Sequence, residues 1–176
     1  MRLLPLVAIA ATLFLGLVAV PAQAGPAELG LLSSYIGKWS GAGVLKGGDK
    51  PPEPFRCRMI ISKGTAAKIN YSGRCTLVNM NLSVAGTIAF DDATQTYQAA
   101  MSSNAGYTGW AVGRSQSGGI DFDLHKKQAD RSGKDVQIGS RIHLVEGGIT
   151  VDFQVEFNDS GQILTATVPF QRQSAG

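Results

Sequence analysis

The sequence predicts an all-β protein: a closed antiparallel up-and-down β-barrel of eight to ten strands, preceded by one short helix. From Trp39 onward apolar residues recur with a period of two, as they do in strands with one buried face. Clusters of Gly, Asp, Asn, Ser and Lys break this pattern about every eight to twelve residues, as hairpin turns do. Only residues 26–36 have apolar residues near helical spacing. These observations together favour a barrel built from consecutive hairpins.

The N-terminus predicts a cleavable secretory signal peptide over residues 1–24. Arg2 precedes an apolar stretch at 3–20, and Ala22-Gln23-Ala24 has the small residues of a cleavage site. An uncleaved membrane anchor is the alternative, because 3–20 is nearly long enough to span a bilayer. We expect cleavage after Ala24 and a periplasmic or secreted product. Residues 25–176 then form one domain, with no later stretch apolar enough to span a membrane.

The short helix and the strands follow from local pattern. Pro26 suits a first helical turn, and we expect the helix at 26–36 to plug one end of the barrel. Some of the candidate strands should merge; they are 38–45, 54–62, 66–72, 74–78, 82–90, 96–102, 107–114, 120–127, 135–145, 149–157 and 162–171. Alternation predicts an inward set of Phe122, Leu124, Ile138, Ile142, Phe153, Val155 and Phe170.

The two cysteines, Cys57 and Cys75, predict one disulfide, because an even cysteine count in an exported protein usually pairs. On the chain-entropy model such a link stabilises the fold by about 3 kcal/mol. A hairpin turning at Lys63-Gly64 would place Cys57 opposite about Asn70. We therefore expect a bulge near Ser72-Gly73 that brings Cys75 into reach.

A short motif links the two ends of the predicted barrel. Gly37-Lys38-Trp39 opens the first strand, and Arg172 ends the last strand in phase with its inward residues. In a closed barrel of even strand number these two strands pair, so Arg172 should stack on Trp39, a contact worth about 0.5 to 2 kcal/mol. The arrangement resembles the calycin superfamily: lipocalins, fatty-acid-binding proteins, avidins and their relatives. This resemblance implies a barrel of that form, with Trp39 and Arg172 as a structural pair at its closed end.

The longer run Gly37-x-Trp39-x-Gly41-x-Gly43 is similar to the opening of the nitrobindin-like haem-binding barrels. The last strands hold no histidine that could act as a haem ligand. We therefore expect no haem and no other cofactor.

The charged residues do not predict catalysis, metal binding or nucleic-acid binding. Alternation places the charged and histidine side chains of the later strands on solvent-facing sides, with no motif that pairs them as acid and base; they are Asp121, Asp123, His125, His143, Asp152 and Glu156. The histidines lack metal-ligand spacing. Loss of Arg2 leaves 15 cationic and 13 acidic residues, a net charge of +2 without a basic run. We expect a protein that is not an enzyme and binds no metal or nucleic acid.

The leading functional prediction is an exported lipocalin-like protein that encloses a small apolar or amphipathic ligand. The predicted ligand-binding residues are Trp110, Arg114, Phe122 and Phe153. Arg114 would anchor an anionic head group if the side of the strand that carries Trp110 faces inward; otherwise it is an exposed charge at a strand end. We expect Arg56 and Arg58 to lie outside as solubilising charges. The alternatives are an exported interaction protein, such as a protease inhibitor working through the rim loop 46–54, and a structural envelope protein.

Overall fold

The computed structural model describes residues 25–49, 51–65, 67–78, 80–116, 119–129, 133–145 and 147–174. The predicted signal peptide, residues 1–24, lies outside the described residues. Within the described part of the chain, no helix is both long enough and apolar enough to cross a membrane.

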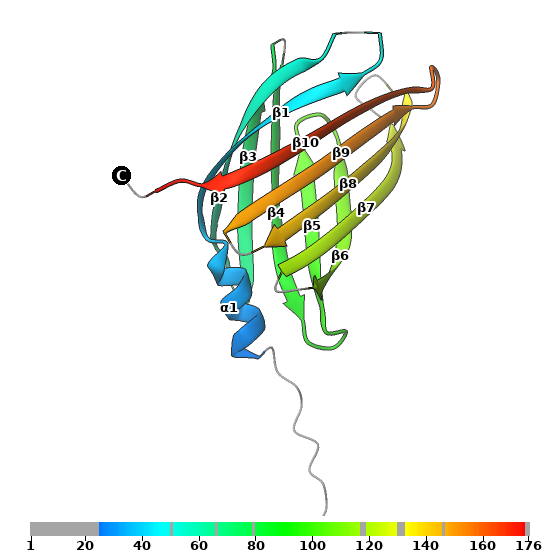
Figure 1. Ribbon diagram of the computed structural model, residues 1–176. Helices are drawn as coiled ribbons and strands as arrows, with labels where there is room; N and C mark the ends of the chain where they lie inside the picture. The colour runs from blue at the N-terminus through cyan, green and yellow to red at the C-terminus, as the bar shows by residue number, and fades with distance from the viewer. Residues whose placement is uncertain are drawn as a thin grey trace, which may run out of the picture.

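Ten antiparallel strands form a closed barrel, and one short helix lies at one end of it (Figure 1). Each strand pairs with its neighbours in sequence, and β1 closes the barrel against β10. The elements are α1 (Pro26–Ser34), β1 (Gly37–Gly47), β2 (Glu53–Lys63), β3 (Lys68–Thr76), β4 (Asn81–Asp91), β5 (Thr96–Ser103), β6 (Thr108–Gln116), β7 (Gly119–Ala129), β8 (Asp135–Val145), β9 (Gly148–Phe157) and β10 (Gln162–Arg172). The predicted up-and-down barrel with a short N-terminal helix is confirmed, and the candidate strands 66–72 and 74–78 form the single strand β3.

The two ends of the barrel differ. At the closed end, where β1 begins and β10 ends, α1 packs under the strands (Figure 1). Its residue Leu32 and the following Tyr35 are almost fully buried and join the main apolar core. The open end is the opposite one, where the β1–β2, β3–β4, β5–β6, β7–β8 and β9–β10 connections lie. The main core therefore starts at α1, and along β1 to β3 it extends toward the open end through Phe55 and Cys57.

Alternation along the strands separates an inward from an outward face, as predicted. The seven residues predicted to face inward are all buried or half-buried; they are Phe122, Leu124, Ile138, Ile142, Phe153, Val155 and Phe170. Both histidines and the four predicted solvent-facing carboxylates have the opposite parity and lie on the outer wall. Burial of the inward apolar area stabilises the barrel by the hydrophobic effect.

Cys57 and Cys75 form a disulfide inside the barrel, between β2 and β3. The two residues lie directly opposite each other, with their Cα atoms 4.0 Å apart. The predicted bulge is wrong, because β2 ends at Lys63 and β3 begins only at Lys68, and the register between them is continuous. The Gly64 N–H donates to the Lys68 carbonyl at 2.9 Å. This longer turn shifts the register so that the cysteines pair without an extra residue.

The β6–β7 seam, which we define as the open-end part of this strand pair, lacks ladder pairing. The two strands pair only from Gly113 opposite Phe122 to Gln116 opposite Gly119. Nearer the open end, side chains of β7 bridge to β6 instead. Gln128 accepts a hydrogen bond from the Thr108 N–H at 3.4 Å and donates one to the Gly106 carbonyl at 3.3 Å. The wall is continuous here through side chains rather than through a backbone ladder.

Candidate functional site

Trp39 and Arg172 form the predicted pair at the closed end. Trp39 is 1% exposed, and its Nε1 donates to the Tyr35 carbonyl at 2.9 Å. The guanidinium carbon of Arg172 lies 4.5 Å from the centroid of the indole. Arg172 also donates to the carbonyls of Ile36, at 2.6 Å, and Ser34. These bonds satisfy carbonyls at the end of α1 that have no helical partner, so the pair fixes the helix under the barrel.

Gly37, the first residue of the motif, is required by this arrangement. Its φ of +150° is one that residues with a side chain rarely adopt. A Cβ at this position would lie 2.5 Å from the Arg172 Nη1 atom. The glycine therefore allows the guanidinium to reach both the indole and the helix end. The contacts of this part of the molecule give it a structural role.

The wall formed by β6 has its small residues inside and its large residues outside. A Cβ at Gly113 would lie 2.5 Å from the ring of Phe122, and one at Gly109 would lie 2.7 Å from Leu124 Cδ2. Two large side chains of β7 thus occupy the interior space over the glycines of β6. This packing needs glycine or alanine on the inward side of β6.

The prediction that Trp110 and Arg114 face the interior is therefore wrong. Trp110 is 58% exposed, and Arg114 is exposed on the same outer side, opposite Asp121 of β7. The physical reason is that the space inside β6 is already filled by Phe122 and Leu124. The alternative interpretation of Arg114, an exposed charge at a strand end, agrees with its position.

The two predicted phenylalanines have different surroundings. Phe122 is 1% exposed and lies within the main core of the closed half. Phe153 is half-buried and packs against a second, separate cluster made of Val136, Ile138 and Val155. Of the four predicted ligand-binding residues, only Phe153 thus combines an inward position with incomplete cover.

The upper interior, as we call it, is a group of inward residues between the two clusters: Leu45, Leu124, Ser140, Phe153 and Ala166. Ser140 lies opposite both Leu124 and Phe153, and Ala166 lies opposite Phe153 on its other side. All five are half-buried although they face inward. Leu45, Leu124 and Ala166 pack against the main core, whereas Phe153 packs against the second cluster. Small side chains at 140 and 166 leave the apolar surface between the clusters incompletely covered.

None of the five residues of the upper interior carries a charge. No polar or charged side chain among the described residues is fully buried. Burial raises the pKa of Tyr71 to about 12, so its phenol stays neutral at physiological pH and donates to the Ala100 carbonyl at 3.2 Å. The Ser140 hydroxyl makes no hydrogen bond to another described residue. The upper interior therefore suits an apolar molecule with at most a few hydrogen-bonding groups.

Lys126 is the cation that sequence reasoning missed. It continues the inward series of Phe122 and Leu124 on β7, and its ammonium reaches across the seam to Thr108 Oγ1 at 3.2 Å. The signal was available in the sequence, because position 126 has the parity of 122 and 124. Lys126 is itself exposed, and Thr108 has the outward parity of Trp110, so the ammonium lies on the outer side of the seam near the open end.

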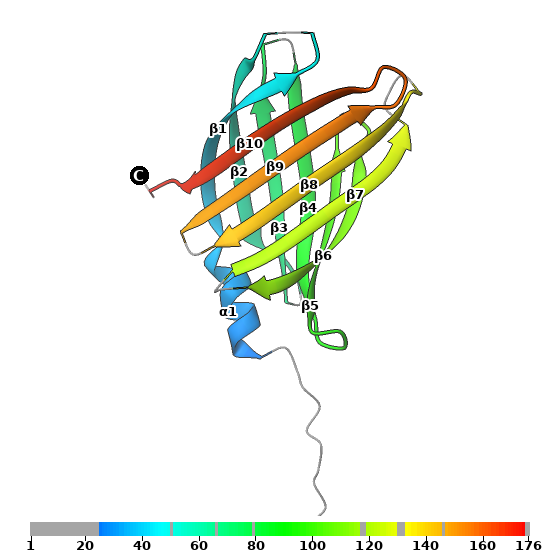
Figure 2. The ribbon, with the colours of Figure 1, turned by 45° about the vertical axis from the view of Figure 1, so that its right-hand side comes forward.

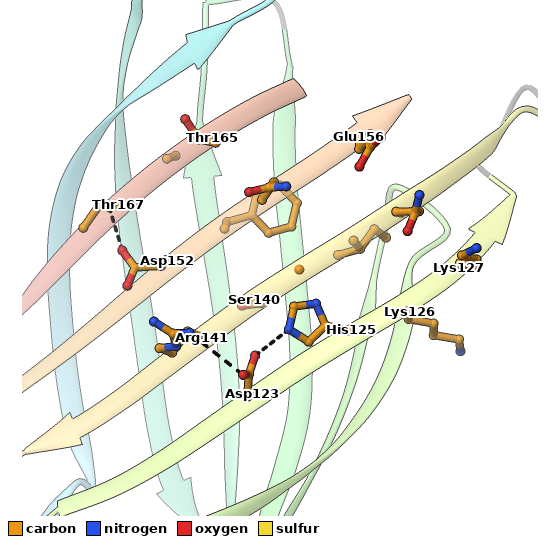
Figure 3. Close-up of a pocket in the computed structure, with 16 residues that line it drawn as sticks. Asp123, His125, Lys126, Lys127, Ser140, Arg141, Asp152, Glu156, Thr165 and Thr167 are labelled. Carbon is orange, nitrogen blue, oxygen red and sulfur yellow. Dashed lines mark hydrogen bonds and ion pairs between the residues drawn. The ribbon is translucent and has the colours of Figure 1, made fainter. Parts of the chain in front are cut away.

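A hollow lies over β7, β8, β9 and β10, which run side by side across the barrel (Figure 2). Most of its lining residues point outward, but the inward Ser140, Phe153 and Ala166 also line it. This polar groove has a volume of about 550 Å³. Figure 3 shows Asp123 between His125 and Arg141, and Thr167 beside Asp152. Asp123 Oδ1 lies 3.1 Å from His125 Nε2, Asp123 Oδ2 lies 4.0 Å from Arg141 Nη2, and Thr167 Oγ1 donates to Asp152 Oδ1 at 2.6 Å. His125, Arg141 and Asp152 thus have polar partners within the groove. Within the described residues, no group of three or more potential ligand side chains is placed to hold a metal ion.

The fold is shared with other barrels of known structure. The chain is similar to the crystal structure of Rv2717c from M. tuberculosis, with a TM-score of 0.66 and 16% identity over 85% of this chain and 99% of that one. It is also similar to the S-type phycobiliprotein lyase CPES from Guillardia theta, with a TM-score of 0.56 and 13% identity over 82% of this chain and 92% of that one. No protein-family model and no curated protein matches the sequence. At these identities the likeness concerns the fold alone.

Proposed function

We propose that this protein is an exported, non-catalytic barrel of calycin type that binds one small apolar or amphipathic molecule in the upper interior. The observation that carries the proposal is the row of half-buried inward side chains between two separate apolar clusters. A ligand there would cover apolar surface that the protein's own side chains leave exposed to water, and that burial is favourable. The calycin resemblance of Gly37, Trp39 and Arg172 supports this function, and so does the shared barrel fold.

The chemistry of the upper interior favours a ligand with an apolar body. Leu124, Phe153 and Ala166 offer only carbon surface, and Ser140 offers one hydroxyl. Lys126, at the open-end part of the β6–β7 seam, would attract an acidic head group that reaches the rim. This proposal replaces the role predicted for Arg114, which lies on the outer wall.

Filling the upper interior should abolish binding. We expect palmitate and hexadecanol to raise the melting temperature of the exported protein, since a ligand that binds only the native state stabilises it. Ser140→Leu should remove this shift, because the larger side chain occupies the ligand's space. Thr165→Leu, which enlarges an outward side chain of β10, should retain it. Ligand-induced shifts that are equal in both variants, or absent in the native protein, would contradict the proposal.

A stability measurement and a charge variant complete this experiment. Urea unfolding of Ser140→Leu without ligand should show no loss of stability, since the site is incompletely covered. If Ser140→Leu is less stable than the native protein, Ala166→Leu serves as a second variant that fills the site. Lys126→Gln should weaken palmitate but leave hexadecanol unchanged, because only the carboxylate would use the ammonium.

Export is part of the proposal. The inward-facing disulfide between Cys57 and Cys75 supports an oxidising compartment. The small residues Ala22 and Ala24 support removal of the first 24 residues. N-terminal sequencing of protein recovered from the host envelope or medium should begin at Gly25. Product that retains residues 3–20 would contradict cleavage.

A further inference from the structure

Cations without acidic partners gather on one side of the outer wall. The outward positions of β10, β1, β2 and β3, four adjacent strands, include no aspartate or glutamate. The same positions hold six cationic residues, namely Lys38, Lys46, Arg56, Arg58, Lys68 and Arg74. The polar groove on β7 to β10 differs, because its arginine and histidine have a carboxylate partner in Asp123. The charge separation comes from the folded register, since these residues are dispersed in the sequence.

We call the outer side of β10, β1, β2 and β3 the basic face, and three of its six cationic residues are arginines. Arg58 on β2 lies directly opposite Arg74 on β3, and Arg56 lies two positions along β2 on the same side. All three are exposed, and none of their guanidinium groups forms an ion pair or hydrogen bond with another described residue. Like charges directly opposite each other in an antiparallel pair are destabilising. Arg58 and Arg74 therefore repel each other, and their exposed side chains contribute no core packing that would require this pair.

Neutral hydrogen-bonding groups lie beside the arginines in a groove. The groove has a volume of about 510 Å³ and is lined by both Arg56 and Arg58. Ser40 on β1 lies opposite Arg58 on one side and Gln171 of β10 on the other. Gln173 Nε2 donates to Ser40 Oγ, which leaves the hydroxyl hydrogen of Ser40 free to donate outward. Guanidinium, hydroxyl and amide donors therefore converge in one hollow.

We propose that this groove is an anion-binding site for a molecule that carries phosphate or sulfate groups. The planar guanidinium presents paired N–H donors that match the oxygens of such groups. Adjacent strands lie about 4.8 Å apart, so the side chains of Arg58 and Arg74 can converge on one oxyanion group. A bound anion would offset the repulsion between them. The site is on the outer wall and is independent of the upper interior.

Binding of inorganic pyrophosphate tests the proposal. Titration calorimetry at low salt should show binding to the native protein that weakens as salt rises. Arg58→Gln should lower the affinity about tenfold or more, the effect of losing a charged hydrogen bond. Arg141→Gln removes the same charge from the polar groove and should leave the affinity unchanged. Without ligand, Arg58→Gln should be at least as stable to urea as the native protein, because it relieves the repulsion.

Vesicles separate the two sources of phosphate. Flotation with phosphatidylcholine vesicles, with and without phosphatidylglycerol, reports binding to lipid head groups. Binding that needs phosphatidylglycerol and Arg58 supports the site with a lipid as its source, and pyrophosphate binding that needs Arg58 supports it with a soluble anion. The proposal is overturned if neither probe binds, or if Arg141→Gln weakens binding as much as Arg58→Gln does.

Discussion

Trp39→Ala is expected to lower the free energy of unfolding by about 3 to 5 kcal/mol, the range for truncation of a large buried aromatic side chain. Trp39 is 1% exposed, contacts the core and holds α1 through its bond to the Tyr35 carbonyl. The variant loses all of these interactions and leaves a cavity at the closed end. Urea denaturation of the native and variant proteins measures the difference.

Trp110→Ala is the matched control, because it removes the same side chain from the outer wall, where it is 58% exposed. Its cost should stay within about 0.5 kcal/mol, as for most surface substitutions. Arg172→Ala should cost about 1 kcal/mol or more through lost stacking on Trp39. Combined with Trp39→Ala, its effect should be clearly non-additive. Equal costs for the two tryptophans, or full additivity of Trp39 and Arg172, would contradict the packing at the closed end.

Phe122→Ala is expected to destabilise the protein by a similar amount, about 3 to 5 kcal/mol. Its ring fills the space over Gly113, so truncation opens a cavity between β6 and β7. Phe153→Ala should cost less, because Phe153 is half-buried, but it should weaken binding of hexadecanol in the upper interior. Urea denaturation and the melting-temperature shift with ligand separate these two effects.

Gly113→Ala tests the same contact from the other side. Alone it places a Cβ 2.5 Å from the Phe122 ring and should cost about 1 to 3 kcal/mol by overpacking. Together with Phe122→Ala it meets no ring, so its own cost should largely vanish. A Gly113→Ala cost that is the same in both backgrounds would mean that the ring does not occupy this space.

The barrel could be predicted because its strongest signals are local. Period-two alternation in strands such as 149–157 identifies the inward face without knowledge of the partners. The contact of Trp39 with Arg172 followed from closure, which requires the first and last strands to pair. The turn between β2 and β3 was less determined, because residues 63–67 include several that fit a turn. The register of the cysteines was predicted incorrectly for that reason.

The inward face of β6 could not be found by local reasoning. Trp110 and Val112 are the larger apolar residues of this strand, so hydrophobicity alone predicts that they face inward. The structure turns Gly109 and Gly113 inward because Leu124 and Phe122 of the next strand need their space. Which side of β6 faces inward depends on how its side chains pack against those of β7. The residue pattern of β6 alone does not contain this information.

The anion-binding groove was also beyond the sequence. The groove residues Ser40, Arg58 and Gln171 and the neighbouring Arg74 lie on four strands, and only the register places them in one row. Along the chain Arg56 and Arg58 look like ordinary solubilising charges. Their lack of acidic neighbours becomes visible only when the outer faces of adjacent strands are compared.

The β6–β7 seam has a consequence for how the barrel moves. Most of the wall is held by backbone ladders, whereas the open-end part of this pair is bridged by the side chains of Lys126 and Gln128. Local opening begins where the fewest backbone hydrogen bonds must break, so β6 and β7 should separate first at the seam. The amides of β6 should therefore undergo hydrogen exchange first. Leu124, at the edge of the upper interior, lies beside the seam. A molecule bound in the upper interior could then enter and leave through the seam as well as through the open end. Its association and dissociation rates would depend on how often β6 and β7 separate.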